Sequence, residues 1–223
     1  MGRLFDIDSP VMRFLGKIAD LMILNLVTLV CCIPVITIGA SLTGMHYVLL
    51  KMVRNEESYI VRSFFKSFKA NFKQATVIWL IVLLGIIIFA ADLRIVSYSS
   101  LEFPAVLKVL LFALFMVGYM VVCYVFPVLA RFDNTVPKTI KNALFMAILS
   151  FPKTVLMMVA YLLPFAVIYF SMMAVPIVFL FGISAPAYLA AMLYSGTFKK
   201  FEPEEEPFVD RFETGEGIDM TED

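Results

Sequence analysis

The chain has 223 residues, of which 61% are hydrophobic, and its formal net charge is zero. Soluble domains are about 45–50% apolar, and the excess here lies in long uncharged runs, which excludes an ordinary soluble domain and indicates membrane spans. The neutral total hides a division, because residues 1–201 carry 17 basic and 8 acidic side chains, whereas residues 202–223 carry Arg211 and ten acids. We therefore expect a single integral membrane domain over residues 1–200 and an acidic disordered cytoplasmic tail over residues 201–223.

The first apolar segment, residues 18–50, contains one charged residue, Asp20. It is long for one straight crossing and short for two, and Pro34 and Gly39 interrupt it near its centre. Two short spans, near 18–33 and 36–52, fit this pattern. One long kinked helix fits it as well.

Three further uncharged runs follow, over residues 75–91, 109–130 and 154–198. The first two are each suited to one crossing, because a helix rises about 1.5 Å per residue and the bilayer core is about 30 Å thick. The third run is long enough for two crossings, with a turn at SMMAVP, where Pro176 interrupts helix formation. We predict spans near 75–96, 107–130, 153–171 and 176–197.

The basic residues favour six spans over five. Cytoplasmic loops collect Lys and Arg, and a six-span arrangement places 16 of the 18 basic residues on the cytoplasmic side. Only Arg94 and Lys108 then lie outside. The sequence thus predicts an all-α polytopic transmembrane bundle of about six spans, with five as the alternative and with both termini in the cytoplasm.

Two basic amphipathic segments, near 58–73 and 136–150, each precede a predicted span, and we call them elbow helices. Phenylalanines in the first recur at three- and four-residue spacing, so they share one helix face with basic residues around it. Such a helix lies in the membrane interface or docks a partner protein, and its single apolar face argues against nucleic-acid binding. The acidic tail is a further candidate to dock on the elbows. The candidate lipid- or partner-contacting residues are Arg62, Phe65, Lys66, Lys69, Lys73, Lys138 and Lys141.

Polar side chains inside the apolar runs are the candidates for a site, because each is costly in a membrane unless it is paired. Asp20 suits a proton or cation site, but it also lies one turn from Lys17, with which it can pair. Asn25 suits a hydrogen bond between helices. His46 is the one histidine, and only two cysteines could complete a metal site with it.

Motifs of known chemistry are absent from the sequence. It holds no nucleophile–base pair, no CxxC spacing and no glycine-rich phosphate-binding loop. We therefore expect no enzymatic activity, no catalytic residue, no cofactor and no metal ion.

Two stretches resemble a known family. Residues 25–75 contain Asn-Leu at 25–26, PVITIG at 34–39, Tyr47 and RSFF at 62–65, and residues 124–147 begin with YVFPVLARFDN. These motifs resemble the YesL-like bacterial membrane proteins, known as domain of unknown function 624. The resemblance covers nearly all of the chain except the acidic tail.

The resemblance implies a multi-pass protein of the bacterial cytoplasmic membrane, in a family without an established activity. Members are often encoded beside sugar ABC transporters. This context implies an accessory or regulatory role in carbohydrate (oligosaccharide) uptake, with the lipid bilayer and sugar ABC transporter subunits as partners and with no nucleic acid. A small transporter or channel in its own right is the alternative.

Overall fold

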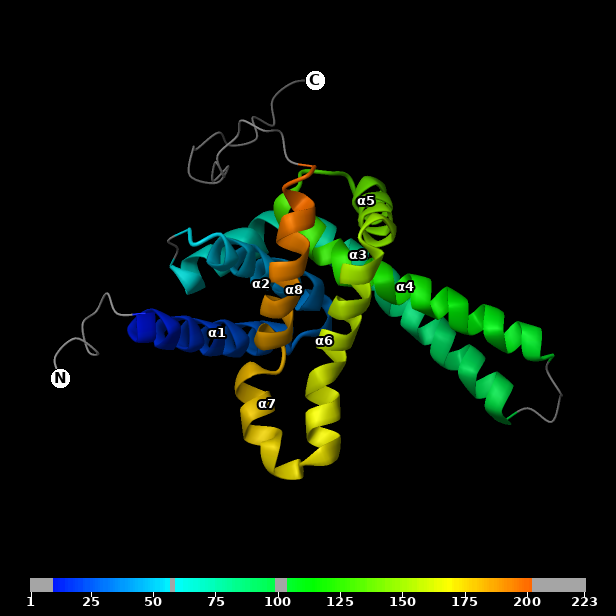
Figure 1. The fold of residues 1–223 in the computed structure, drawn as a ribbon. Helices are drawn as coiled ribbons and strands as arrows, with labels where there is room; N and C mark the ends of the chain where they lie inside the picture. The colour runs from blue at the N-terminus through cyan, green and yellow to red at the C-terminus, as the bar shows by residue number, and fades with distance from the viewer. Residues whose placement is uncertain (1–9, 57–58, 99–103, 202–223) are drawn as a thin grey trace, which may run out of the picture.

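The computed structural model describes residues 10–56, 59–98 and 104–201, and these residues form helices with no strand among them (Figure 1). The helices are α1 (Pro10–Cys32), η2 (Val35–Thr37), α2 (Ile38–Val53), α3 (Ile60–Tyr98), α4 (Ala105–Arg131), α5 (Val136–Leu149), α6 (Phe151–Phe170), η3 (Met172–Ala174), α7 (Val175–Phe181) and α8 (Ser184–Phe198). Among these described residues, five segments are long and apolar enough to cross a bilayer, and α7 with α8 makes up to six if this bent pair is one span. The prediction of an all-α polytopic bundle is confirmed.

The first apolar segment forms two helices, and one long kinked helix is not observed. Helix α1 ends at Cys32, and α2 begins at Ile38 after the short helix η2. The hydroxyl of Thr37 closes the turn, since its Oγ1 lies 2.6 Å from the carbonyl oxygen of Cys31 and 2.7 Å from that of Pro34. Pro34 cannot continue an α-helix without losing a backbone bond, so the chain turns back there.

The buried core lies where α1 and the two hairpins α3–α4 and α6–α7 meet (Figure 1), and we call this region the base. Helix α2, the last part of α4 and helix α8 supply most of its buried residues. Its largest fully buried side chains are Tyr124, Tyr194, Phe64, Phe126 and Phe198. The core thus joins residues that are far apart in the sequence.

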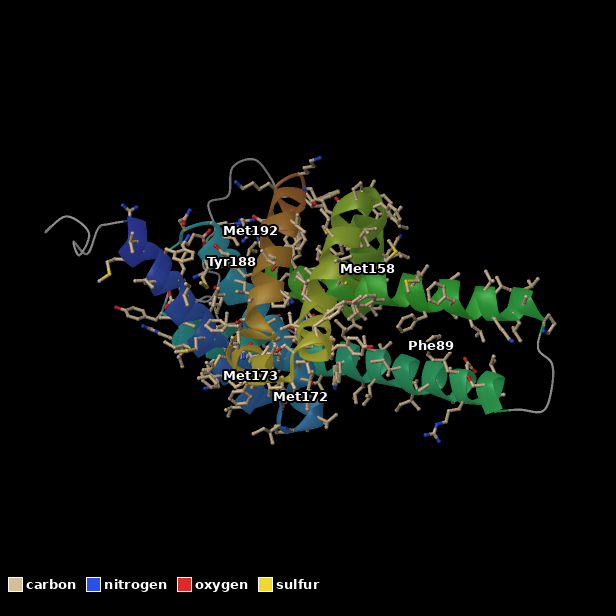
Figure 2. The ribbon with its side chains drawn as sticks, turned by 60° about the horizontal axis from the view of Figure 1, so that its bottom comes forward. Phe89, Met158, Met172, Met173, Tyr188 and Met192 are labelled. Carbon is tan, nitrogen blue, oxygen red and sulfur yellow. The ribbon has the colours of Figure 1, made fainter. Side chains whose placement is uncertain are left out.

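Two helical hairpins, α3–α4 and α6–α7, leave the base in different directions (Figure 1). Stacked rings of Phe89 and Phe115, with centroids 4.2 Å apart, join α3 to α4, and Figure 2 shows Phe89 on the side of α3 that faces α4. The outer surfaces of both hairpins are apolar: Leu114 is 71% exposed, and Met173, at the end of the α6–α7 hairpin, is 92% exposed. Apolar side chains exposed along spans are compatible with contact to lipid tails or to another membrane protein.

The first predicted elbow and the third predicted span are parts of one helix rather than two. Helix α3 runs for 39 residues without a break, because residues 60–98 contain no proline and only one glycine. Phe64, on the elbow part, is fully buried. A Cβ atom added at Gly44 of α2 would lie 3.2 Å from its ring. The phenylalanine face therefore packs against α2 within the chain.

The second predicted elbow is a separate helix, α5. Ser150 divides it from α6, and Pro152 in the first turn of α6 lacks the N–H group that an uninterrupted helix would use. Small or polar residues such as Thr139 and Ala143 are buried on its inner side. Phe145 and Ile148 are 59% and 60% exposed. Helix α5 thus presents large apolar side chains away from the protein, as an interfacial helix does.

Candidate functional site

The last apolar segment is interrupted between α7 and α8. Helix α7 ends at Phe181, α8 begins at Ser184, and their axes differ by 56°. Gly182 occupies the bend, where an added Cβ would lie 2.7 Å from a side-chain carbon of Val178 and closer still to the Val178 carbonyl oxygen. A residue with a side chain could not take this place without a shift of the backbone.

Asn25 of α1 satisfies the backbone groups that the interruption releases. Its Oδ1 atom accepts hydrogen bonds from the backbone N–H groups of Ile183, at 3.0 Å, and Ser184, at 2.9 Å. Its Nδ2 atom donates to the carbonyl oxygen of Phe179 at 2.9 Å. Asn25 is fully buried. One amide side chain thus caps the start of α8 and the end of α7 together, which matters because a helix terminus leaves N–H and C=O groups without partners.

If the α6–α7 turn lies at the membrane surface, the bend between α7 and α8 lies near the middle of the bilayer. The ten residues Met172–Phe181 separate it from the end of the α6–α7 hairpin. At about 1.5 Å per residue this is about 15 Å, half of a bilayer core of about 30 Å. Broken helices at this depth form substrate and ion sites in many transporters. Here the three bonded backbone groups are already occupied by Asn25.

His46 lies in the base, between α2 and α8. Its Nδ1 atom is 3.2 Å from the hydroxyl oxygen of Tyr194, and the two rings meet edge to face with centroids 5.9 Å apart. His46 is 4% exposed and Tyr194 is fully buried. The buried hydroxyl of Tyr161 has no hydrogen-bond partner among the described residues. Within the described part of the chain, no three His, Cys, Asp or Glu side chains form a group that could hold a metal ion.

A second polar group joins the start of α6 to its neighbours, and the sequence reasoning did not single it out. The hydroxyl of Thr154 donates to the carbonyl oxygen of Ala147 at 2.8 Å and lies 3.4 Å from the hydroxyl of Tyr124. The hydroxyls of Ser150 and Thr197 are 3.0 Å apart. Thr154 also donates to the carbonyl oxygen of Ser150 at 3.1 Å, a bond to the preceding turn that threonine in a helix commonly makes. Its long-range partners carry no sequence signal.

Asp20, the third polar candidate, is half-buried on α1. Lys17, one turn away, donates from Nζ to Oδ1 of Asn55 at 3.0 Å, so this lysine ties α1 to the turn that follows α2. The three intramembrane candidates, Asp20, Asn25 and His46, are therefore not brought together in one site. Asn25 serves the helix break, and His46 serves the contact between α2 and α8.

The basic candidates lie on two surfaces. Arg62, Lys69 and Lys73 are exposed along one side of α3, and we call these three residues the basic stripe. Lys66 lies between them but is half-buried and has an interaction partner of its own. Phe65, beside the stripe, is 39% exposed. On α5, the exposed residues of the set are Lys138 and Lys141.

Comparison with known protein families gives a match to the N-terminal part of the chain. Residues 21–93 match a family model described as "Protein of unknown function, DUF624". Neither the curated proteins nor the solved structures include a match. The matched segment covers Asn25, His46 and the basic stripe, and it ends within α3. The chain is thus a multi-pass helical membrane protein whose residues 21–93 are similar to the domain of unknown function 624.

Proposed function

We propose that this protein is an accessory or regulatory component associated with carbohydrate (oligosaccharide) ABC uptake in the bacterial cytoplasmic membrane, and that it is not an enzyme. The resemblance of its motifs to the YesL-like proteins supports the carbohydrate context. Sugar ABC transporter subunits and the lipid bilayer are the partners in this proposal, and nucleic acid is not one.

The observation that carries the proposal is that Asn25 forms hydrogen bonds with the backbone groups at the helix break. A transporter with a broken helix at mid-depth uses the released backbone groups to hold its substrate or coupling ion. Here Asn25 binds the carbonyl of Phe179 and the N–H groups of Ile183 and Ser184. A helix break that is closed from within the chain supports a structural role for the interior, and so it favours action through the surface.

The exposed side chains of the hairpins α3–α4 and α6–α7 also support a role in which the protein acts through its surface. Their faces hold large exposed apolar side chains such as Leu114, at 71%, and Phe170, at 85%. In a membrane such faces contact lipid or the spans of a neighbouring protein. A transporter subunit that inserts between two diverging hairpins would meet apolar surface on both sides.

The test compares oligosaccharide uptake with transport by the isolated protein. We expect deletion of the gene to lower uptake of labelled oligosaccharide in cells that retain the ABC transporter, and to have no effect in cells that lack it. We also expect the purified protein to carry the transporter subunits through mild-detergent purification. Unchanged uptake in the deletion strain, together with purification free of transporter subunits, would contradict the proposal.

A second candidate function, a small transporter or channel, is favoured by the position of the helix break near mid-depth. In that case the Asn25 amide would exchange its backbone partners for hydroxyl groups of the substrate. Proteoliposomes that contain only this protein distinguish the two functions. Flux of oligosaccharide or ions that Asn25→Ala abolishes would establish the second function, and the absence of flux would leave the accessory role.

A further inference from the structure

The basic stripe of α3 is a concentrated positive surface. Arg62, Lys69 and Lys73 follow one another at intervals of seven and four residues, which places them on one side of a helix. All three are exposed. Helix α3 contains no acidic residue before Asp92, so its own sequence supplies no neutralising partner along this side. Like charges at such spacing repel one another unless an anionic partner covers them.

The stripe is poorly placed for contact with lipid headgroups. Because α3 is one continuous helix, the stripe continues along the axis of the following span rather than turning into the membrane plane. Lys69 and Arg62 lie about 6 Å and about 16 Å beyond Lys73 along that axis. The apolar face that would anchor an interfacial helix is occupied, since Phe64 is buried against α2.

Helix α5 provides the contrast. Lys138 and Lys141 on its exposed side are followed, on the same side, by Phe145 and Ile148, which are 59% and 60% exposed. A helix with lysines and exposed apolar side chains on the same side is suited to lie on a lipid surface. The stripe on α3 therefore calls for a different anionic partner.

The chain itself contains a segment with the opposite properties. Residues 202–223 lie outside the described residues and hold ten acids against Arg211. They also hold Phe208 and Phe212, four residues apart. These two apolar side chains could contact the exposed Phe65 and Val61 beside the stripe. Charge and apolar character are thus complementary between the two surfaces.

The place where the described chain ends allows this contact. Phe198, the last residue of α8, is buried in the base, with its ring centroid 5.3 Å from that of Phe132. Helix α2 packs against both α8 and α3, so the end of α8 and the first half of α3 flank the same helix. A chain of 22 residues can span at most about 70 Å, which is more than enough to cross one helix.

We propose that the acidic segment, residues 202–223, docks on the basic stripe of α3 and shields it from other anionic partners. Each exposed ion pair is weak and screened by salt, so the contact depends on several pairs together. It is therefore reversible and releases at high ionic strength. A partner protein with a more acidic surface would displace the segment.

The experiment measures cleavage of residues 202–223 by a glutamate-specific protease, in the full-length protein reconstituted in nanodiscs of zwitterionic lipid. We expect the stripe variant Arg62→Glu/Lys69→Glu/Lys73→Glu to be cleaved about tenfold faster than the wild type at low salt, since three weak pairs are lost. High salt should bring the wild type to the same rate. The matched control, Lys138→Glu/Lys141→Glu on α5, should leave the rate within about twofold.

A second measurement covers the case in which the stripe variant does not fold. A protein truncated after Phe201 should bind a fluorescent peptide of residues 202–223, and single reversals at Lys69 or Lys73 should weaken the binding. A cleavage rate that responds to neither salt nor the stripe variant would overturn the proposal. So would an equal effect of the α5 control, or release of the segment by anionic lipid in the nanodisc.

Discussion

The Oδ1 atom of Asn25 lies 2.9 Å from the backbone nitrogen of Ser184 and accepts its hydrogen bond. This contact joins the first span to the start of α8, 159 positions along the chain. It allows the last apolar segment to bend without leaving buried backbone groups unpaired, which would be costly within a bilayer. The hydrogen bonds of Asn25 therefore stabilise the bend between α7 and α8.

Replacement of Asn25 by Ala should destabilise the protein by about 2–4 kcal/mol, because each buried polar group left without a partner costs about 1–3 kcal/mol. The measurement is unfolding by SDS in mixed micelles, followed by circular dichroism. Asn71→Ala is the matched control, since among the described residues Asn71 bonds to Ser67 on its own helix. Equal stability of the two variants would show that Asn25 does not hold the break.

Gly39 lies where α2 packs tightly against α3. A Cβ atom at this position would lie 2.7 Å from the Cβ of Trp79 and would also collide with the carbonyl oxygen of Ala75. We expect Gly39→Ala to destabilise the protein by about 1–3 kcal/mol through overpacking. Gly85→Ala on the exposed part of α3 is the control, because nothing lies within 4 Å of its added Cβ. A thermal melt in detergent that orders the two variants the other way would refute this contact.

The neighbours Phe64 and Phe65 should differ sharply on truncation. Phe64 is fully buried and Phe65 is 39% exposed. Phe64→Ala should therefore cost about 3–5 kcal/mol, as large-to-small changes in a core do, and Phe65→Ala should cost far less. The same SDS titration measures both. If the first half of α3 rested on lipid through its phenylalanines instead, the two losses would be alike.

The bond between His46 and Tyr194 is accessible to a double-mutant cycle. We expect Tyr194→Phe and His46→Phe each to reduce stability, and the pair to show a coupling energy of about 1 kcal/mol. Tyr169→Phe, at a position that is 87% exposed, should have no measurable effect. A coupling energy of zero would mean that the hydroxyl of Tyr194 does not act through the imidazole.

The helical class and most helix positions follow from the sequence. Uncharged runs indicate the spans, and Pro34 and Pro176 indicate two of the places where helices end, because proline removes a backbone donor. The junction of the first elbow with the third span could not be resolved in this way. An amphipathic stretch followed by an apolar stretch predicts two separate helices. Residues 60–98 nevertheless form one helix, because no residue among them ends it.

The candidate site was less predictable than the fold. Asn25 was recognisable as a buried polar residue suited to a bond between helices. Its partners were not, because they are backbone groups of residues 179, 183 and 184, and any sequence has such groups. In the sequence, Gly182 is one of several single glycines in apolar runs. Only the packing of α1 against α7 and α8 distinguishes it.

The central claim is that α7 and α8 form one broken crossing, with the α6–α7 turn and the end of α8 on opposite sides of the membrane. The direct test is labelling of single cysteines at Met173 and Lys199 in intact cells, after replacement of Cys31, Cys32 and Cys123. A membrane-impermeant maleimide should label position 173 from outside, and position 199 only after permeabilisation. Labelling of both positions from the same side would show that α7 and α8 form a re-entrant segment, and would contradict the account.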